Sequence, residues 1–152
     1  MEVATYSPSD VVVTFGGYIL EDWESITVER SLPSHKIITG IRGKNSRNAV
    51  KNTSATVTVE LAQTSLANYI FQKIVELDEA TGNGRISITI KDTLGGEVFY
   101  SDDTFIEAPA SRTYSADIST RTWKMNCLSS TYNTSEESVS LSSIFDLARN
   151  LF

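Results

Sequence analysis

The chain has 152 residues, of which 40% are hydrophobic and 21% charged, and these values are ordinary for one folded domain with a sizeable core. Its single cysteine, Cys127, excludes an internal disulfide and a cysteine-based zinc site. The sequence contains no signal-peptide pattern and no apolar run long enough to span a membrane. We therefore expect a soluble protein without a membrane anchor, made in a reducing cytoplasm.

The formal net charge is −6, but it is distributed unevenly along the chain. Residues 30–59 contain no acidic residue and carry a formal charge of +6, while the rest of the chain has seven basic and nineteen acidic residues, a charge of −12. Such segregation favours contact with a negative partner, either nucleic acid or an acidic surface on another copy of the chain. The basic residues of this stretch are Arg30, Lys36, Arg42, Lys44, Arg47 and Lys51.

Most of the chain shows the period-2 alternation that is typical of half-buried antiparallel strands. Gly16 with Gly17, and Gly95 with Gly96, are predicted to form hairpin turns. The pattern predicts a mainly β fold, an antiparallel sandwich or barrel. In chain order the predicted strands are residues 11–15, 25–30, 55–61, 85–91, 97–100, 104–107 and 120–128.

One packed α-helix is predicted at about residues 64–81, because apolar residues recur there at helical spacing. Thr64 or Ser65 can cap its first turn, and the Gly-Asn-Gly sequence of residues 82–84 can end it. Three acids lie in its last turn, where they oppose the helix dipole. A solvated face explains them most simply, and contact with a basic partner is the sharper alternative. These acids are Glu76, Asp78 and Glu79.

The long basic loop at about residues 39–53 is either the tip of a long hairpin or a loop that becomes ordered on assembly. It lacks the interleaved aromatic residues that stack on bases in single-strand binders, which leaves a phosphate-only contact as the nucleic-acid alternative. A body of charge −12 opposes the approach of DNA. Self-association fits better, and repeated head-to-tail contacts give rings or filaments.

The composition changes near residue 128, so residues 1–128 are predicted to form the β domain. Residues 129–152 then form a C-terminal extension. Its first part is a Ser/Thr-rich linker, and from residue 139 it is an amphipathic segment that packs on its own domain or on a neighbouring subunit.

Catalytic machinery is hard to assemble from this chain. His35, the only histidine, lies in a turn-like context, and Asp102 and Asp103 are adjacent, so their carboxylates diverge on an extended chain. Residues 40–45 lack the spacing of a phosphate-binding loop, and Cys127 fits a small buried hydrophobe. We therefore expect that the chain is not an enzyme and that it binds no metal ion and no cofactor.

Many short segments match one known family, in order between residues 6 and 128. They are residues 6–13, 15–18, 26–30, 47–48, 54–60, 63–65, 77–82, 90–92, 107–109 and 120–123. In these segments the chain resembles the tail tube proteins of contractile-tailed bacteriophages. The resemblance does not cover the extension after residue 128.

The resemblance implies a virion protein that forms stacked hexameric rings of an inner tube. It also implies partners: other copies of the chain, a tail sheath protein, and baseplate and tail-terminator proteins at the tube ends. DNA would pass through the tube without specific binding, repelled by a negative lumen. From charge alone, Glu97, Asp102, Asp103 and Asp117 are candidates for the lumen, and the three helix acids for the sheath-facing surface.

Three alternatives stay open. A tail terminator, a tube initiator or a baseplate-proximal ring shares the fold that the resemblance implies. A carbohydrate-binding β-sandwich is a different class, in which Tyr18, Trp23, Tyr114 and Trp123 would stack on sugars, although core or interface packing explains these aromatics better. A nucleic-acid-binding protein comes third.

Overall fold

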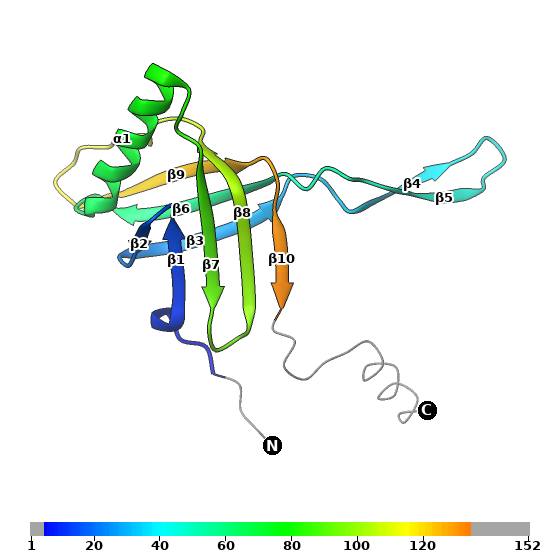
Figure 1. The fold of residues 1–152 in the computed structure, drawn as a ribbon, viewed down its shortest axis with the longest axis horizontal. Coiled ribbons are helices and arrows are strands. Elements are labelled where there is room, and N and C mark those ends of the chain that lie inside the picture. The colour runs from blue at the N-terminus through cyan, green and yellow to red at the C-terminus, as the bar shows by residue number, and fades with distance from the viewer. Residues whose placement is uncertain (1–4, 135–152) are drawn as a thin grey trace.

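The computed structural model describes residues 5–134, and their fold is mainly β with one α-helix, as the sequence predicts (Figure 1). A short 3₁₀ helix, η1 (Pro8–Asp10), precedes the first strand, and the α-helix is α1 (Leu66–Thr81). The strands are β1 (Val11–Phe15), β2 (Tyr18–Leu20), β3 (Trp23–Arg30), β4 (His35–Thr39), β5 (Asn45–Ala49), β6 (Ala55–Ala62), β7 (Ile86–Asp92), β8 (Glu97–Ile106), β9 (Thr120–Cys127) and β10 (Thr131–Thr134).

Eight of the strands form one antiparallel sheet in the order β2-β1-β7-β8-β9-β6-β3, with β10 paired to β8. Strand β8 links the two halves of this sheet, because its first part pairs with β7 and β10 and its last part pairs with β9. The sequence predicted two strands here, at residues 97–100 and 104–107. The structure joins them into one ten-residue strand.

A β-bulge explains why the sequence pattern is interrupted within β8. Ile88 pairs with Ser101 and Ile86 pairs with Thr104, so β8 contains one more residue than β7 between these pairs. Bulges bend a strand and increase its twist. Here the sheet folds over at β8, so that β3, β6 and β9 cross the direction of β1, β7 and β8 (Figure 1). This is the arrangement of a β-sandwich whose corner strand belongs to both layers.

The hydrophobic core lies between the two halves of the sheet and beneath α1. Strand β6 buries every second residue, as its sequence alternation predicts. The predicted hairpin turns at Gly16 and at Gly96 are confirmed, and both glycines have a positive φ. The fully buried large side chains include Leu20, Val57, Val59, Leu61, Phe71, Ile88 and Met125.

Helix α1 begins and ends close to the predicted bounds. The Ser65 side chain accepts a hydrogen bond from the amide of Ala67 at 3.2 Å, and it therefore caps the first turn. Gly82 ends the helix with φ of 72°, and its amide donates to the carbonyl of Asp78 at 2.8 Å.

Phe71 and Asn68 hold α1 on the sheet. The ring of Phe71 packs edge-on against Phe15 and Trp123, with centroids 5.1 and 5.6 Å away. The indole Nε1 of Trp123 donates to Oδ1 of Asn68 at 2.9 Å, while Nδ2 of Asn68 donates to the carbonyl of Ala62 at 2.8 Å. The helix is thus fixed by both apolar and polar contacts.

Strand β10 lies within the stretch for which the sequence predicted a linker. It pairs with β8 from Thr131 opposite Tyr100 to Thr134 opposite Glu97, so the sheet continues past residue 128. Its β-branched and aromatic residues favour a strand, which outweighs the Ser/Thr-rich composition around them. The rest of the predicted linker and the amphipathic segment from residue 139 lie outside the described residues.

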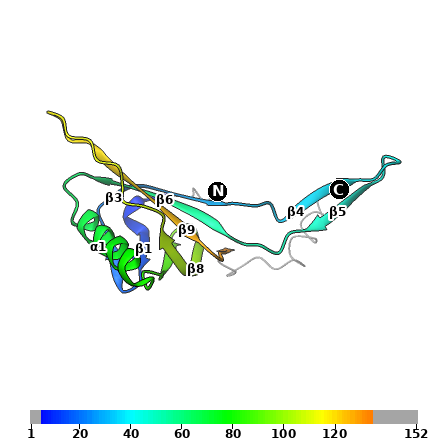
Figure 2. The ribbon, with the colours of Figure 1, turned by 90° about the horizontal axis from the view of Figure 1, so that it is seen from above.

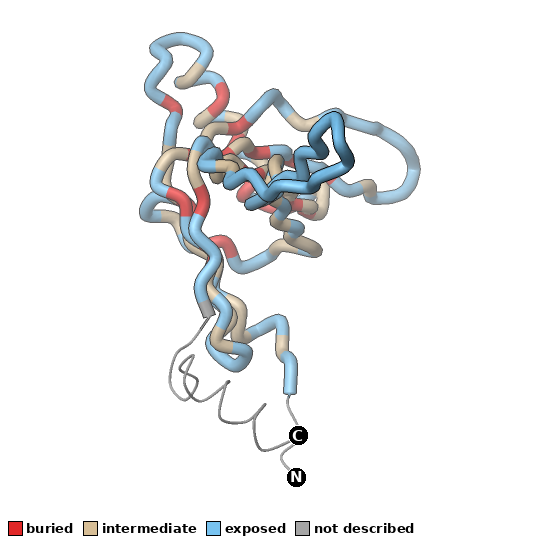
Figure 3. Tube along the Cα trace, turned by 90° about the vertical axis from the view of Figure 1, so that its right-hand side faces the viewer, coloured by how far each residue is buried: buried red, intermediate tan, exposed pale blue. Residues whose placement is uncertain are grey.

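Strands β4 and β5 form a separate two-stranded sheet that extends away from the body (Figures 1 and 2). All ten of their residues are exposed (Figure 3). Of the two alternatives for the basic loop, the structure has the long hairpin. Strand β5 occupies part of the predicted loop, because cross-strand pairing with β4 satisfies its backbone groups without a core.

Candidate assembly interface

Residues 31–54, which we call the arm, leave the body between β3 and β6 and return to it. The arm contains five basic residues and no acidic residue, so its formal charge is +5, and the remaining eight basic and nineteen acidic residues give −11. None of its basic side chains forms an ion pair with any residue of the described range 5–134. The arm thus presents its whole charge to solvent.

The tip of the arm is an ordered turn. The amide of Gly43 donates to the carbonyl of Gly40 at 2.9 Å, and the amide of Gly40 donates to the carbonyl of Lys44 at 2.8 Å. Gly43 has φ of 83°, a conformation that side-chain-bearing residues rarely adopt. The turn therefore places Ile41 and Arg42 at the tip of the arm.

Each face of the arm carries both basic and apolar side chains among polar ones. Residues directly opposite one another share a face. Arg47 lies opposite Ile37 on one face, and Lys36 lies opposite Asn48 on the other. The four basic residues predicted for the loop all lie on the arm and are spread along its length. They are Arg42, Lys44, Arg47 and Lys51.

Three isoleucines of the arm are strongly exposed. The exposed fractions are 77% for Ile37, 53% for Ile38 and 106% for Ile41. The arm has no core of its own, so these side chains contribute no hydrophobic stabilisation in the monomer. Contact with a second surface can bury them. Exposed apolar side chains beside unpaired cations fit contact with a surface that is both apolar and acidic.

The root of the arm is held by residues that the sequence reasoning missed. The guanidinium of Arg30 donates from Nε to Oγ of Ser130 and from Nη2 to its carbonyl, both at 3.3 Å, and it lies 5.2 Å from the ring centroid of Tyr132. Oγ of Ser130 donates to the carbonyl of Thr53 at 2.6 Å. Arg30 thus belongs to the body, and the strand pattern of residues 131–134 was the signal that could have revealed its partners.

The three helix acids have different surroundings. Glu76 pairs with Lys73 at 3.2 Å and Glu79 is exposed, so both lie on the solvent side of α1. This pairing raises the pKa of the Lys73 ammonium through its hydrogen bond to Glu76. Asp78 is half-buried and accepts from the amide of Gly84 at 3.0 Å, so it closes the turn after the helix.

The four candidate lumen acids lie on two elements. Glu97 begins β8, Asp102 and Asp103 lie at its bulge, and Asp117 is in the loop between β8 and β9. Asp103 pairs with Arg85 at 3.3 Å and Asp102 accepts from Ser129 Oγ at 3.1 Å. These two carboxylates therefore have local partners, while Glu97 and Asp117 are exposed.

The aromatic residues considered for sugar stacking do not form one platform. Trp123 is only 3% exposed and packs on Phe71 in the core, so neither face of its ring is available to a ligand. The guanidinium of Arg121 lies 5.6 Å from the ring centroid of Tyr114. Tyr18 and Trp23 lie on β2 and β3.

The candidates for chemistry do not gather into a site. His35 is exposed on β4, and Cys127 is buried and lies 3.3 Å from Oγ1 of Thr104. Within residues 5–134, no group of three His, Cys, Asp or Glu side chains is placed to hold a metal ion. No helix in this range is long and apolar enough to cross a membrane.

The fold is shared with assemblies of contractile injection systems. The anti-feeding prophage cap, a tube-terminating cap, matches with a TM-score of 0.59 and 11% identity over 89% of this chain and 95% of that chain. A chain of the PVC sheath–tube complex in its extended state matches with a TM-score of 0.60 and 11% identity. The match covers 86% of this chain and 92% of that chain. The PVC sheath/tube terminator matches with a TM-score of 0.55 and 12% identity. The match covers 86% of this chain and 97% of that chain. At these identities the likeness shows the fold alone.

At the level of sequence, the chain is similar to a phage structural protein. Structural protein ORF10 of Pseudomonas phage KPP10 is 25% identical over 140 residues, which cover 85% of this chain and 81% of that protein. No protein-family model matches the chain. The chain is thus similar in sequence to a phage structural protein and similar in fold to tube-related proteins of contractile injection systems.

Proposed function

We propose that this chain is a non-enzymatic structural protein of a phage tail, which assembles into rings that stack as the inner tube of a contractile tail. The observation that carries this proposal is the arm, which has a charge of +5 and extends away from the body, while the rest of the chain has a charge of −11. A charged projection with exposed isoleucines is stabilised by contact with an oppositely charged surface on the next subunit.

The open edges of the sheet support lateral assembly. In the eight-stranded sheet, β2 and β3 are the outermost strands, and β3 has eight residues. An exposed edge strand carries unpaired backbone groups, which a strand from another copy can satisfy. Rings formed in this way, six-membered as the tail-tube resemblance implies, leave the arms to link subunits and successive rings.

The negative charge of the body fits a conduit for DNA. Glu97 and Asp117 are exposed and have no ionic partner within residues 5–134, so either one facing the bore would repel phosphates. Such a surface lets DNA slide through during ejection without specific binding. The role requires no catalytic group, metal or cofactor.

The outer face of α1 is the proposed contact for a tail sheath protein. Glu76 and Glu79 lie there beside Leu66, Tyr69 and Leu77, which are 67%, 62% and 50% exposed. Acidic and apolar side chains together suit a sheath surface with basic and apolar residues. Baseplate and terminator proteins would meet the two ends of the tube.

A tube-terminating ring is the second candidate, and the fold shared with a tube-terminating cap and with a sheath/tube terminator favours it. The two roles differ in one property. A tube protein stacks without limit, whereas a terminator forms a single ring that binds the end of an existing tube.

Electron microscopy of the purified protein tests the proposal and separates the two roles. We expect tubes, and single rings alone would favour the terminator. A variant with Arg42, Lys44, Arg47 and Lys51 all changed to Glu should remain folded by circular dichroism and fail to form tubes. Normal tubes from this variant would contradict the role of the arm.

A further inference from the structure

A groove, which we call the inner groove, opens between β3 and the layer that contains β1, β7, β8 and β10. Val28 of β3 lines it from one side, and Ile90, Phe99 and Tyr132 line it from the other. Its volume is about 450 Å³, within the range of about 300–1,000 Å³ that is typical of ligand sites. The inner groove is therefore large enough to receive a few apolar side chains.

The strand register shows that these side chains face the inner groove. Ile90 and Tyr132 both lie opposite Phe99, one on each side of β8, so the three share one face of the sheet. Val28 lies opposite the buried Val57 and packs against the core in the same way. The rings of Phe99 and Tyr132 meet edge-on with centroids 5.1 Å apart, yet Tyr132 is 47% exposed. The hydrophobic core thus reaches the surface at this groove.

The rim of the inner groove carries charges of both signs. Asp92 lies opposite Glu97 at one end, and the Asp92 carboxylate accepts from the amides of residues 94 and 95 at 3.2 and 3.0 Å. The guanidinium of Arg30 lies over the ring of Tyr132. An apolar groove with such a rim favours an occupant that is apolar and nearly neutral, rather than the arm, whose charge is +5.

We propose that the inner groove is filled by residues 139–152 of the same chain, which lie outside the described residues. The inference does not depend on the assembly proposed above. Eight of these fourteen residues are apolar, and their side chains have no net formal charge, because one acid, Asp146, is balanced by one base, Arg149. Six of the apolar residues recur at the spacing that places side chains on one face of a helix, and such a face fits an apolar groove. They are Leu141, Ile144, Phe145, Ala148, Leu151 and Phe152.

The inner groove lies where the described part of the chain ends. Thr134, the last residue of β10, is opposite Glu97 on the rim, and Tyr132, two residues earlier, lines the groove. From Thr134 to Val139 the chain spans at most about 18 Å, so the segment begins within reach. A tether this short gives an effective concentration on the order of millimolar, which favours the groove's own segment over that of a neighbouring copy.

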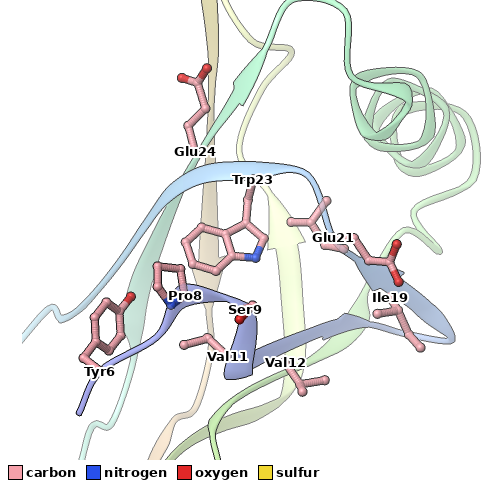
Figure 4. A pocket seen from close by; sticks show the side chains of 10 residues that line it. Tyr6, Pro8, Ser9, Val11, Val12, Ile19, Glu21, Trp23 and Glu24 are labelled. Carbon is pink, nitrogen blue, oxygen red and sulfur yellow. The ribbon is translucent and has the colours of Figure 1, made fainter.

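A second groove at the beginning of β3, which we call the Trp23 groove, is the competing site (Figure 4). The Trp23 indole lines it together with Val12 and Ile19. Among the described residues, none from β8 or β10 lines this groove. Trp23 is also five residues from Val28 along β3, a distance of about 17 Å. The chain that leaves β10 therefore does not begin at the edge of the Trp23 groove.

Trypsin cleavage after Arg149 tests whether the segment is bound. Arg149 is the only lysine or arginine after Lys124, so release of the last three residues, followed by mass spectrometry, reports this one event. Val28→Asp puts a charge into the inner groove, and Ile144→Asp with Phe145→Asp puts charges on the segment. Each change should speed the cleavage at least about tenfold, because trypsin cuts the released segment. Faster cleavage of the segment variant alone, with Val28→Asp folded by circular dichroism, would overturn the proposal.

Two matched controls separate the proposed contact from the added charge. Ile19→Asp places the same charge in the Trp23 groove, and Ser142→Asp with Ser143→Asp places the same charges at polar positions of the segment. Both should leave the cleavage rate within about twofold of the wild type. Acceleration by Ile19→Asp but not by Val28→Asp would place the segment in the Trp23 groove. Wild-type cleavage as fast as that of a free peptide of residues 139–152 would also overturn the proposal.

The source of the segment is tested in a chain that does not assemble. The variant with the four arm cations changed to Glu should keep the slow cleavage after Arg149, at a rate that is independent of protein concentration over about a hundredfold range, because the contact lies within one chain. Protection that disappears in this variant or on dilution would show that a neighbouring copy supplies the segment, and would contradict the same-chain contact.

Photochemical cross-linking gives a readout that requires no loss of binding. The photoreactive residue p-benzoylphenylalanine in place of Phe145 should form adducts within one chain, on peptides that contain Val28, Phe99 or Tyr132. The same residue in place of Ser143, a polar position of the segment, should give at least about tenfold less of these adducts. Adducts confined to other parts of the body, to the arm or to a second chain would overturn the proposal.

Discussion

The guanidinium of Arg30 lies 5.2 Å from the ring centroid of Tyr132, and this contact joins the root of the arm to the last described strand of the body. Arg30 ends β3 and Tyr132 lies on β10, 102 residues later in the chain. Ser130 completes the junction by bonding to both Arg30 and Thr53, which lie on the outgoing and the returning side of the arm's root. These contacts therefore fix the root of the arm to the body.

Arg30→Met should loosen this root without unfolding the body. The change removes two hydrogen bonds and the cation–π contact of a half-buried group, so we expect the free energy of unfolding to fall by about 1–2 kcal/mol. Hydrogen exchange should become faster at the amide of Ser31, which donates to the carbonyl of Ser54 at 3.0 Å.

The matched control for this variant is Lys73→Met on α1. Lys73 also lies over an aromatic ring, 5.5 Å from the centroid of Tyr69, but it is exposed and far from the arm in the fold. It should leave both the stability and the exchange at Ser31 close to those of the wild type. Equal exchange in wild type and Arg30→Met would argue against a braced root.

Asn68→Ala should release α1 from the sheet. The amide of Asn68 satisfies the indole of Trp123 and the carbonyl of Ala62, and its removal leaves both poorly satisfied. We expect a loss of about 1–3 kcal/mol, measured by urea unfolding followed through tryptophan fluorescence. Asn83→Ala, an exposed asparagine after the helix, is the control and should be within about 0.5 kcal/mol of wild type.

Much of the fold follows from local patterns in the sequence. The alternation in β6 and β9 predicts their buried faces, and Ser65 and Gly82 mark the ends of α1, because caps and periodicity depend on neighbouring residues. The bulge at Asp102 and Asp103 was not predictable in the same way, since it arises from the register between β7 and β8.

The candidate interface was predictable only in part. An acid-free stretch identified the arm by charge alone, but the participation of Arg30 in the body depends on Ser130 and Tyr132, which are distant in sequence. The acid candidates show the same limit. In the sequence, Asp78 and Asp103 cannot be told from acids that are simply exposed. Only the fold shows that Asp78 closes a turn and that Asp103 pairs with Arg85.

Gly84→Ala should destabilise the turn after α1. A Cβ at Gly84 would lie 2.3 Å from Cβ and 3.0 Å from Cα of Asp78, so the turn must move and the bond between Asp78 and the Gly84 amide must lengthen. We expect a loss of about 1–3 kcal/mol in thermal or urea unfolding. Gly17→Ala meets no atom within 4 Å and has no positive φ, so it should be nearly neutral. Equal stability of the two variants would contradict the close approach.

Assembly should weaken with salt and should depend on the isoleucines as well as the cations of the arm. The screening length falls from about 10 Å at 0.1 M salt to about 3 Å at 1 M, so attraction between the exposed arm and the body is largely lost. Sedimentation at increasing sodium chloride should therefore show assemblies dissociating toward smaller species. Burial of Ile37 and Ile41 is not screened, and their replacement by Ser should lower the salt concentration at which half of the protein dissociates. Assemblies that grow steadily with sodium chloride would instead indicate an apolar contact in which the charge of the arm has no part.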